Sequence, residues 1–144
     1  MAPEDLDEVM AIEDESFPVP WSRNFFEREL ALKFSRTFIA REGGVTGPVM
    51  GYAVVWFVAD ELHLLNIAVA PQHRRKGAAR LLLERVLAEA RGRECELVVL
   101  EVRKSGIPAQ TLYQSMGFAP VGIRPRYYSD NGEDAIVMVC RVGE

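Results

Sequence analysis

A run of basic and small residues in the middle of the chain is the first feature that could bind a ligand. Residues 74–79 read RRKGAA and lie where an apolar segment gives way to a segment with helical periodicity. The first backbone N–H groups of a helix have no partner within the helix, and the helix dipole makes this end positive. Small side chains let an anion approach the backbone closely. These residue types therefore predict an anion site, most naturally one for a phosphate.

The order of the residues in this turn argues against two common nucleotide-binding motifs. A Walker loop needs Gly-Lys-Ser/Thr at the helix start, whereas this chain has Lys76-Gly77-Ala78 and no hydroxyl to hold magnesium. The dinucleotide fingerprint needs three glycines, and only Gly77 is present. The alternative is a solvated basic helix start, and the six residues alone favour neither interpretation.

Glu101 interrupts an otherwise apolar segment that has the pattern of a strand. With a two-residue period it shares a face with Leu97 and Val99, so its carboxylate is expected to be partly buried. Such a carboxylate could act as a general base near neutral pH, directly or through a water. The alternative is a strand-end glutamate that faces solvent or pairs with Arg103 or Arg126. Taken alone, the position of Glu101 in the sequence favours that alternative.

Tyr113 is a candidate proton donor on a short predicted helix. It lies five residues beyond Pro108, which is about 7.5 Å along a helix that rises about 1.5 Å per residue. A phenol near that helix end could donate a proton to a departing thiolate. For an isolated tyrosine, a packing role with the hydroxyl at the surface is the stronger interpretation. Glu101 and Tyr113 gain weight only if the fold places them beside the phosphate turn.

The elements around the turn make that placement plausible. Residues 62–69 form a nearly continuous apolar strand, residues 78–90 carry one apolar helical stripe, and residues 96–102 form another strand. A strand–helix–strand unit of this kind is parallel, with a right-handed crossover. Both strands therefore end at the same edge of the sheet, where open α/β sheets bind ligands. The phosphate turn, Glu101 and Tyr113 are expected to share one crevice.

The remaining pattern predicts a mixed α/β (α+β) protein in a single domain over residues 1–144. Two helices precede the strands, the second starting after the N-cap Ser22, and the prolines in 17–21 exclude helix between them. The predicted helices outside the central unit cover 3–16, 22–33 and 108–116, and the predicted strands cover 37–41, 49–58, 121–124 and 135–141.

Composition excludes several classes of partner. The chain has 144 residues, 26% of them charged, and a net charge of −4, which argues against general affinity for nucleic acid or anionic membranes. No apolar run is long enough to cross a membrane and no signal sequence is visible, so a cytoplasmic protein is expected. The spacing of Cys95, Cys140, His63 and His73 fits no metal site, and none is expected.

Several longer motifs resemble one family of enzymes. Residues 100–118, LEVRKSGIPAQTLYQSMGF, are similar to L-E-V-R-x-S-N-x-x-A-x-x-L-Y-x-x-x-G-F. The turn has the form R-x-x-G-x-A, and further matches are FPVPWS at 17–22, NIAV at 66–69 and YY at 127–128 followed by EDA at 133–135. Together they cover nearly the whole chain and resemble the GNAT N-acetyltransferases. Within that family they are most similar to the RimI-type branch, which acetylates the N-terminal alanine of a small-subunit ribosomal protein.

The resemblance implies a GNAT acyl-CoA N-acyltransferase fold, whose sheet is splayed between the strands at 62–69 and 96–102. It implies acetyl-CoA as co-substrate, Glu101 as the base and Tyr113 as the acid that protonates the CoA thiolate. Residues implied to bind CoA are Ile67, Ala68, Val69, Arg74, Arg75, Lys76, Gly77, Ala78, Ala79 and Gly106. At Gly106 the family has an asparagine, so one side-chain contact to CoA is missing here.

The resemblance also implies a protein N-terminus as the acceptor, with Tyr127, Tyr128 and the Glu133-Asp134 loop near the incoming peptide. Acetylation of a lysine side chain or a small-molecule amine, or a non-catalytic CoA-binding module, are the alternatives. An α-amine has a pKa of about 7.7–8.0 against about 10.4 for lysine, so neutralising lysine at pH 7 costs about 3 kcal/mol more. The expected reaction is direct attack in a ternary complex, since no cysteine is expected in the crevice. The sequence does not indicate the oligomeric state.

Overall fold

The computed structural model describes residues 1–74 and 77–143. Its strands form one mixed sheet, and helices cover both faces of that sheet. The sheet has the strand order β1-β2-β3-β4-β6-β5. Its strands are β1 (Ser35–Arg41), β2 (Val49–Val58), β3 (Glu61–Val69), β4 (Leu97–Arg103), β5 (Ala119–Arg124) and β6 (Ala135–Arg141). The helices are α1 (Leu6–Ser16), α2 (Arg23–Ala31), α3 (Ala78–Gly92) and α4 (Ile107–Ser115), with 3-10 turns η1 (Pro3–Asp5) and η2 (Pro71–His73). The predicted elements are therefore present, with ends shifted by at most two residues, except that the first predicted helix begins as the 3-10 turn η1 and becomes α-helical only at Leu6.

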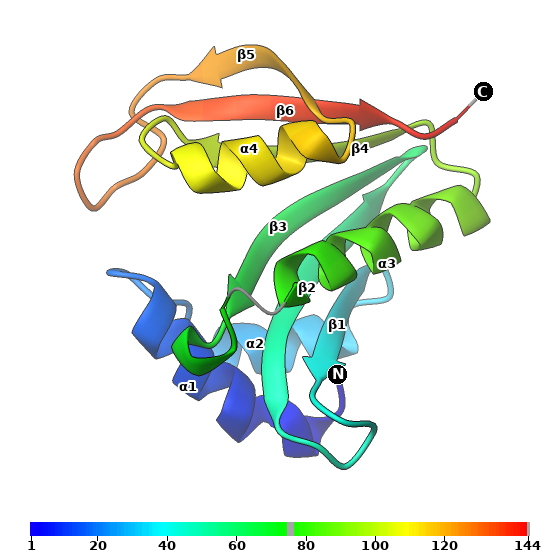
Figure 1. Ribbon diagram of the computed structural model, residues 1–144, viewed down its shortest axis with the longest axis vertical. Coiled ribbons are helices and arrows are strands. Elements are labelled where there is room, and N and C mark those ends of the chain that lie inside the picture. The colour runs from blue at the N-terminus through cyan, green and yellow to red at the C-terminus, as the bar shows by residue number, and fades with distance from the viewer. Residues whose placement is uncertain (75–76, 144) are drawn as a thin grey trace.

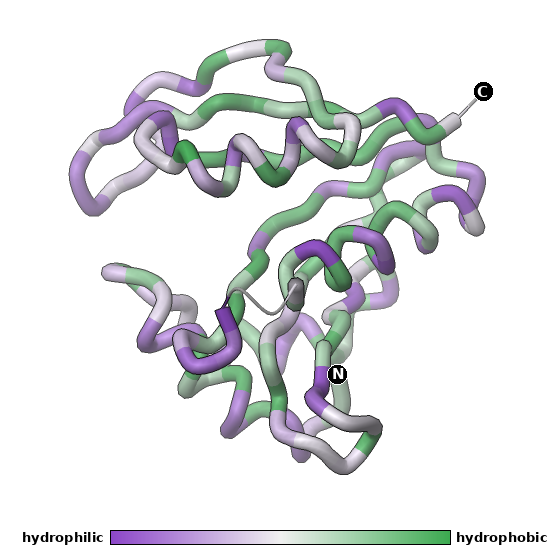
Figure 2. The backbone as a smooth tube through the Cα atoms, viewed as in Figure 1, coloured by the Kyte–Doolittle hydropathy of each residue, from purple (hydrophilic) through white to green (hydrophobic). Residues whose placement is uncertain are grey.

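The helices cover the sheet in two layers. α3 and α4 lie on one face, while α1 and α2 lie on the opposite face of β1–β3 (Figure 1). The apolar stripe of α3 packs on the sheet because its leucines and valines recur every three to four residues. Figure 2 shows hydrophobic residues along β3, whereas the loop between β5 and β6 is mainly hydrophilic.

The sheet opens between β3 and β4. These strands pair in parallel only from Glu61–Leu97 to Leu64–Leu100. Directly afterwards the pairing of β3 with β2 shifts by one residue, which leaves Leu65 as a bulge. A bulge bends its strand, and β3 then continues beside β2 while β4 continues beside β6. The two strands therefore separate toward their C-terminal ends (Figure 1), which confirms the predicted splay.

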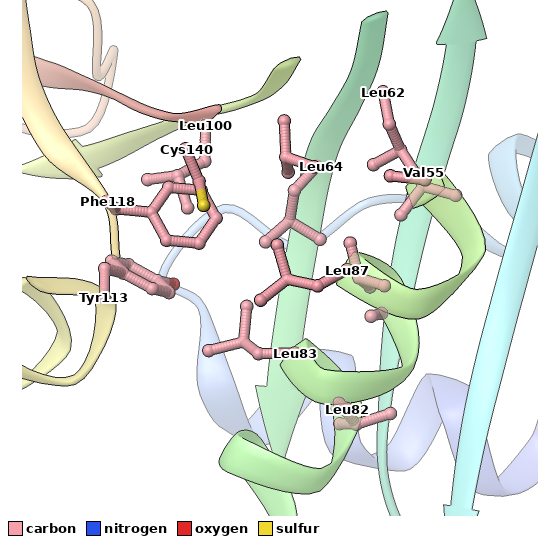
Figure 3. Packing of buried hydrophobic residues seen from close by; sticks show 14 of the residues in the cluster. Val55, Leu62, Leu64, Leu82, Leu83, Leu87, Leu100, Tyr113, Phe118 and Cys140 are labelled. Carbon is pink, nitrogen blue, oxygen red and sulfur yellow. The ribbon is translucent and has the colours of Figure 1, made fainter. Parts of the chain in front are cut away.

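Buried side chains from both halves of the sheet meet on the face that α3 and α4 cover. Figure 3 shows Tyr113 and Phe118 from the C-terminal half beside Leu64 and Leu83 from the N-terminal half. The Tyr113 and Phe118 rings lie 5.8 Å apart between centroids. The packing of these two rings against Leu64 and Leu83 holds α4 against the split.

The loop between α1 and α2 covers residues 17–22 and ends at a helix cap. The Ser22 hydroxyl accepts a hydrogen bond from the Phe25 N–H at 3.1 Å, as the sequence predicted. Within the part of the chain that the structure describes, no helix combines the length and apolarity that crossing a bilayer requires.

Candidate active site

A cavity of about 280 Å³ lies in the split between β3 and β4. Its lining includes Ile67 from β3, Glu101 from β4 and Tyr113 from α4. The parallel crossover and the splay thus bring the two predicted catalytic residues into one cavity. The separation of the strands is what gives both side chains access to the same space.

Glu101 is held at the edge of this cavity by an ion pair. Its side chain is 20% exposed, and its Oε1 atom lies 2.9 Å from Nη1 of Arg124 on β5. The alternative interpretation of the sequence named Arg103 or Arg126 as the partner, and the structure has Arg124 in that place. Arg124 reaches the carboxylate because β5 pairs with β6, which itself pairs with β4. The Arg124 guanidinium also lies over the Tyr127 ring, 4.8 Å from its centroid.

Tyr113 reaches the cavity from the apolar side. Its side chain is buried, and burial raises the pKa of its phenol to about 12. The hydroxyl therefore keeps its proton through the whole neutral range and remains a hydrogen-bond donor. The expectation that Tyr113 packs with its hydroxyl at the surface does not describe this side chain.

A second cavity, of about 290 Å³, lies at the predicted phosphate turn. Gly77 is the N-cap of α3 and has a φ of +78°, a left-handed conformation that glycine adopts without strain. The first backbone hydrogen bond of α3 runs from the Leu81 N–H to the Gly77 carbonyl at 3.0 Å. The N–H groups of the helical residues before Leu81 therefore have no partner within the helix. Arg74 lines the same cavity, and its Nε donates to the Val69 carbonyl at 3.3 Å. Arg75 and Lys76 lie outside the described residues.

A third cavity, of about 300 Å³, connects the first two. It lies between the end of β3 and α4 and shares Val69 with the turn and Ile67 and Tyr113 with the central cavity. Its other walls are mostly apolar, and they include Ala79 and Leu112. The described residues predicted to bind CoA all line this series of cavities, namely Ile67, Ala68, Val69, Arg74, Gly77, Ala78, Ala79 and Gly106.

The fourth cavity, of about 500 Å³, extends from the other side of the central one. It is lined by Glu13, by residues 17–21 of the loop between α1 and α2, by Asn66 of β3 and by residues 127–130. Phe17, Asn66 and Tyr128 also line the central cavity. The four spaces therefore form one path from the phosphate turn, past Glu101 and Tyr113, to this large cavity, which we call the acceptor cavity.

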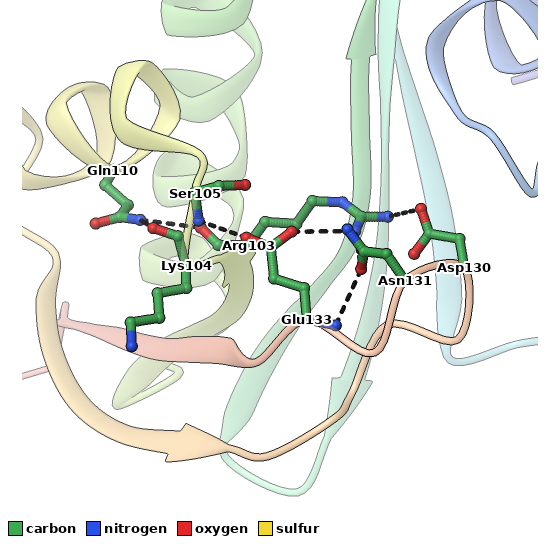
Figure 4. Close-up of polar contacts among 7 residues, drawn as sticks. All are labelled: Arg103, Lys104, Ser105, Gln110, Asp130, Asn131 and Glu133. Carbon is green, nitrogen blue, oxygen red and sulfur yellow. Dashed lines mark hydrogen bonds and ion pairs between the residues drawn. The ribbon is translucent and has the colours of Figure 1, made fainter.

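Arg103 holds the loop that closes the acceptor cavity (Figure 4). Its guanidinium donates to Asp130 at 3.0 Å and to Glu133 at 3.4 Å, and lies 4.0 Å above the centroid of the Tyr128 ring. Glu133 also accepts a hydrogen bond from the Ser105 N–H at 2.6 Å. Hydrogen bonding with Ser105 lowers the pKa of Glu133 below its ordinary value. The loop is thus fixed by charge-assisted bonds, which are the strong ones.

The structure separates the residues that were expected near a peptide. Tyr127 and Tyr128 line the acceptor cavity. Glu133 and Asp134 do not line it. Glu133 bonds to Ser105 as described, and Asp134 accepts a hydrogen bond from the Arg126 N–H at 3.0 Å. These two acids shape the loop rather than face the cavity.

Sequence reasoning missed Glu13, Asn66 and Arg124. Glu13 did carry a signal, because it lies four residues after Val9 and seven after Leu6 on the buried stripe of α1. A carboxylate at such a position must find partners in the fold. Arg124 carried no comparable signal, because its pairing with Glu101 depends on the position of β5.

Comparisons with known proteins agree with this geometry. The sequence model of the Acetyltransferase (GNAT) family matches residues 6–118. Over 143 residues the chain is 37% identical to the ribosomal protein bS18-alanine N-acetyltransferase of Escherichia coli, an alignment that covers 96% of this chain and 92% of that protein. The corresponding protein of Haemophilus influenzae is 33% identical over 144 residues, covering 94% and 92%. The chain belongs to the GNAT acetyltransferase family.

Solved structures show the same relationship. The crystal structure of the ribosomal-protein-alanine N-acetyltransferase from Escherichia coli superposes with a TM-score of 0.88 at 33% identity, covering 100% of this chain and 92% of that one. Ard1 from Thermoplasma volcanium superposes with a TM-score of 0.87 at 26% identity, covering 100% and 95%. The predicted fold and the predicted acetyltransferase class are both confirmed.

Proposed function

We propose that this chain transfers the acetyl group of acetyl-CoA to the N-terminal α-amine of a protein, and that its substrate is a ribosomal protein that begins with alanine. The observation that carries the proposal is the continuous path of cavities with Glu101 and Tyr113 at its middle. The names of the related bacterial enzymes support the choice of substrate. One domain over residues 1–144, acting in the cytoplasm, would carry the whole activity.

The residues between the turn and the split fit acetyl-CoA. The pyrophosphate would lie at the Gly77 turn, where the helix N-terminus offers backbone donors to an anion. The pantetheine would lie along 67–69 of β3, beyond the point where β4 leaves that strand. Backbone groups on that edge can pair with an extended ligand as with an added strand. The apolar wall formed by Ala79 and Leu112 suits the alkyl part of that arm.

The reaction would be a direct attack in which atoms and charges balance. The amine nitrogen forms its bond to the acetyl carbon while the carbon–sulfur bond breaks. Glu101 takes the proton of the amine, directly or through a water, and the thiolate leaves toward Tyr113. The buried phenol has a pKa of about 12, whereas an ordinary thiol has one of about 8.5. Burial therefore favours donation of a hydrogen bond from Tyr113 to the developing thiolate. The CoA sulfur leaves as the thiolate, the phenol keeps its proton, and the proton of the amine remains on Glu101.

The acceptor cavity favours a peptide over a small amine. It is the largest of the four spaces, and two loops from distant parts of the chain form its walls. A polyamine would use little of that wall. A lysine side chain remains the second candidate acceptor, although its deprotonation at pH 7 costs about 3 kcal/mol more than that of an α-amine. A non-catalytic CoA-binding module would not need Glu101 and Tyr113 in the same cavity.

The proposal is tested by following release of the CoA thiol with three acceptors. These are a ribosomal-type peptide with a free N-terminal alanine, the same peptide with a blocked N-terminus and one internal lysine, and a polyamine. We expect turnover with the first, and less than about a hundredth of that rate with the other two, because only the first offers an amine of low pKa inside a peptide. Turnover confined to the lysine peptide or the polyamine, or no turnover at all, would overturn the proposal.

A further inference from the structure

Glu13 is a buried carboxylate at the wall of the acceptor cavity. Its side chain lies within α1 and is 1% exposed, yet it contributes to the cavity lining. Donors from separate elements converge on it. Asn66 Nδ2 of β3 donates to Oε1 at 2.8 Å, the Tyr52 hydroxyl of β2 donates to the same oxygen, and the Trp21 N–H donates to Oε2 at 2.9 Å. An ionised carboxylate accepts hydrogen bonds and donates none, so the three donors around Glu13 match its charged form.

The Trp21 contact fixes the loop that walls the acceptor cavity. Residues 17–21 contain two prolines and form neither helix nor strand, so few backbone bonds hold this stretch in place. The bond to Glu13 ties its far end to α1, while the Trp21 ring packs 4.3 Å from Phe25 and 5.6 Å from Phe26 between centroids. The position of residues 17–21 at the acceptor cavity therefore depends on Glu13.

The Asn66 contact links the same carboxylate to the split. Asn66 directly follows the Leu65 bulge and lines both the acceptor cavity and the central cavity. Glu13 thus bonds at once to the loop on one side of the acceptor cavity and to the strand at its base. Neither cavity on the CoA side contains Glu13, Asn66 or a residue of 17–21.

We propose that Glu13 is a positioning residue that sets the acceptor cavity for the first residues of the peptide, without taking part in the chemistry. The inference rests on the proposed function, because it assigns the amine end of the path to that cavity. Loss of Glu13 should therefore weaken recognition of the peptide and leave recognition of acetyl-CoA intact.

Glu13→Gln tests this claim. The variant keeps the shape of the side chain, but its amide places an N–H₂ group against either the Trp21 N–H or the donors from Tyr52 and Asn66. One of the contacts is then lost in either orientation. We expect the KM for an alanine-initiated peptide to rise about tenfold, as for the loss of one charge-assisted hydrogen bond. The KM for acetyl-CoA should stay within about twofold, which is the usual scatter around an unaffected site.

Glu29→Gln is the matched control. Glu29 is 5% exposed and accepts hydrogen bonds from Ser35 at 2.8 Å and Trp56 at 2.6 Å, but it lines none of the four cavities. The substitution removes the same charge from an equally buried position. We expect a lower Tm and an unchanged KM for the peptide. Kinetics of each variant are measured well below its own Tm.

Tyr52→Phe is a milder second variant, useful if Glu13→Gln does not fold. Tyr52 is fully buried and lines none of the four cavities, and the hydroxyl that the substitution removes donates to Glu13. We expect the KM for the peptide to rise about two- to threefold, in the range of one neutral hydrogen bond. In Glu13→Gln the amide oxygen should stay toward the two donors Tyr52 and Asn66, which turns the N–H₂ group toward the Trp21 N–H. Exchange of the Trp21 amide hydrogen should therefore accelerate in Glu13→Gln and stay unchanged in Glu29→Gln.

The outcomes separate this inference from the proposed function. If the unmodified protein acetylates no N-terminal amine, the proposed function fails before the variants are compared. If it does, and Glu13→Gln behaves like Glu29→Gln in its KM for the peptide, the role of Glu13 is overturned. The role is equally overturned if acetyl-CoA and peptide lose affinity together.

Discussion

The two ends of the active-site path are built in different ways. The CoA end uses residues 67–69, 73–74 and 77–80 together with α4. Its donors are the backbone N–H groups at the Gly77 turn and the side chains of Arg74 and Arg80. The acceptor end collects residues from 13–21, 65–66, 103 and 127–130. Charge-assisted hydrogen bonds hold those segments together, through Glu13 on one wall and Arg103 on the other.

This difference separates what the two ends can do. Backbone donors around a small-residue turn recognise the same phosphates whatever the acceptor is, since they depend little on side chains. Side-chain bonds between distant segments can be changed one at a time, so the acceptor end can change its specificity while the CoA end stays fixed. Substitutions at one end should therefore alter the KM for acetyl-CoA, and substitutions at the other end should alter the KM for the peptide. Only substitutions of Glu101 and Tyr113, which lie in the central cavity at the junction of the two ends, should alter kcat alone.

Glu101→Gln gives the largest expected effect. The amide cannot accept the proton of the amine, so kcat should fall about 100-fold, within the usual range for a general base. Calorimetric binding of acetyl-CoA should be nearly unchanged, because the turn and the β3 edge remain. A parallel loss of acetyl-CoA affinity would place Glu101 at the CoA end and remove it from the junction.

Tyr113→Phe is expected to lower kcat about tenfold, as for loss of one proton donor. It also gives a pH test. The folded pKa of about 12 lies above the ordinary value of about 10, so the contribution of Tyr113 to the free energy of unfolding is complete below pH 10. That contribution is lost as the pH rises through 12. Denaturant melts between pH 9 and 12 should therefore show a steeper loss of stability for the unmodified protein than for the variant. Equal slopes would contradict the burial of this hydroxyl.

Arg103→Gln tests the acceptor end alone. It removes the bonds to Asp130 and Glu133 that fix residues 127–130. The KM for the peptide should rise about fivefold, since charge-assisted bonds that are partly exposed contribute about 1 kcal/mol. Initial rates with acetyl-CoA varied at saturating peptide should give an unchanged KM. A change in that constant would mean that the two ends are coupled.

Gly77→Ala is the reciprocal test at the CoA end and the smallest effect. A Cβ at this position meets no atom within 4 Å, so the cost comes from the φ of +78° alone. That strain amounts to about 1 kcal/mol for an alanine. We expect a weaker affinity for acetyl-CoA by a few-fold and a small decrease in Tm, with the KM for the peptide unchanged. A lower affinity for the peptide alone would reverse the assignment of the two ends.

The positions of residues at the Gly77 end of the path were easier to predict from the sequence than those around the acceptor cavity, and the reason is physical. Residues 67–69, 74 and 77–79 belong to one supersecondary unit, so local periodicity and the rule of right-handed crossovers place them. The sequence did not indicate Arg124 as the partner of Glu101, because Arg124 reaches it through two strand pairings that no local pattern specifies. The sequence placed Glu133 and Asp134 near the incoming peptide, but it could not show that Glu133 bonds to Arg103 and Ser105 and Asp134 to the Arg126 N–H instead of lining the cavity.

The sequence by itself determined the elements, the parallel unit, the glycine turn before α3 and the family, because hydrophobic period, glycine placement and motif spacing are local properties. The tertiary structure alone decided which residues wall the acceptor cavity. Glu13 sits on an apolar helical stripe, and only the folded chain brings Tyr52, Asn66 and Trp21 to its carboxylate. Buried charges must be matched by donors wherever the fold can supply them, so their partners come from distant segments that sequence spacing does not reveal.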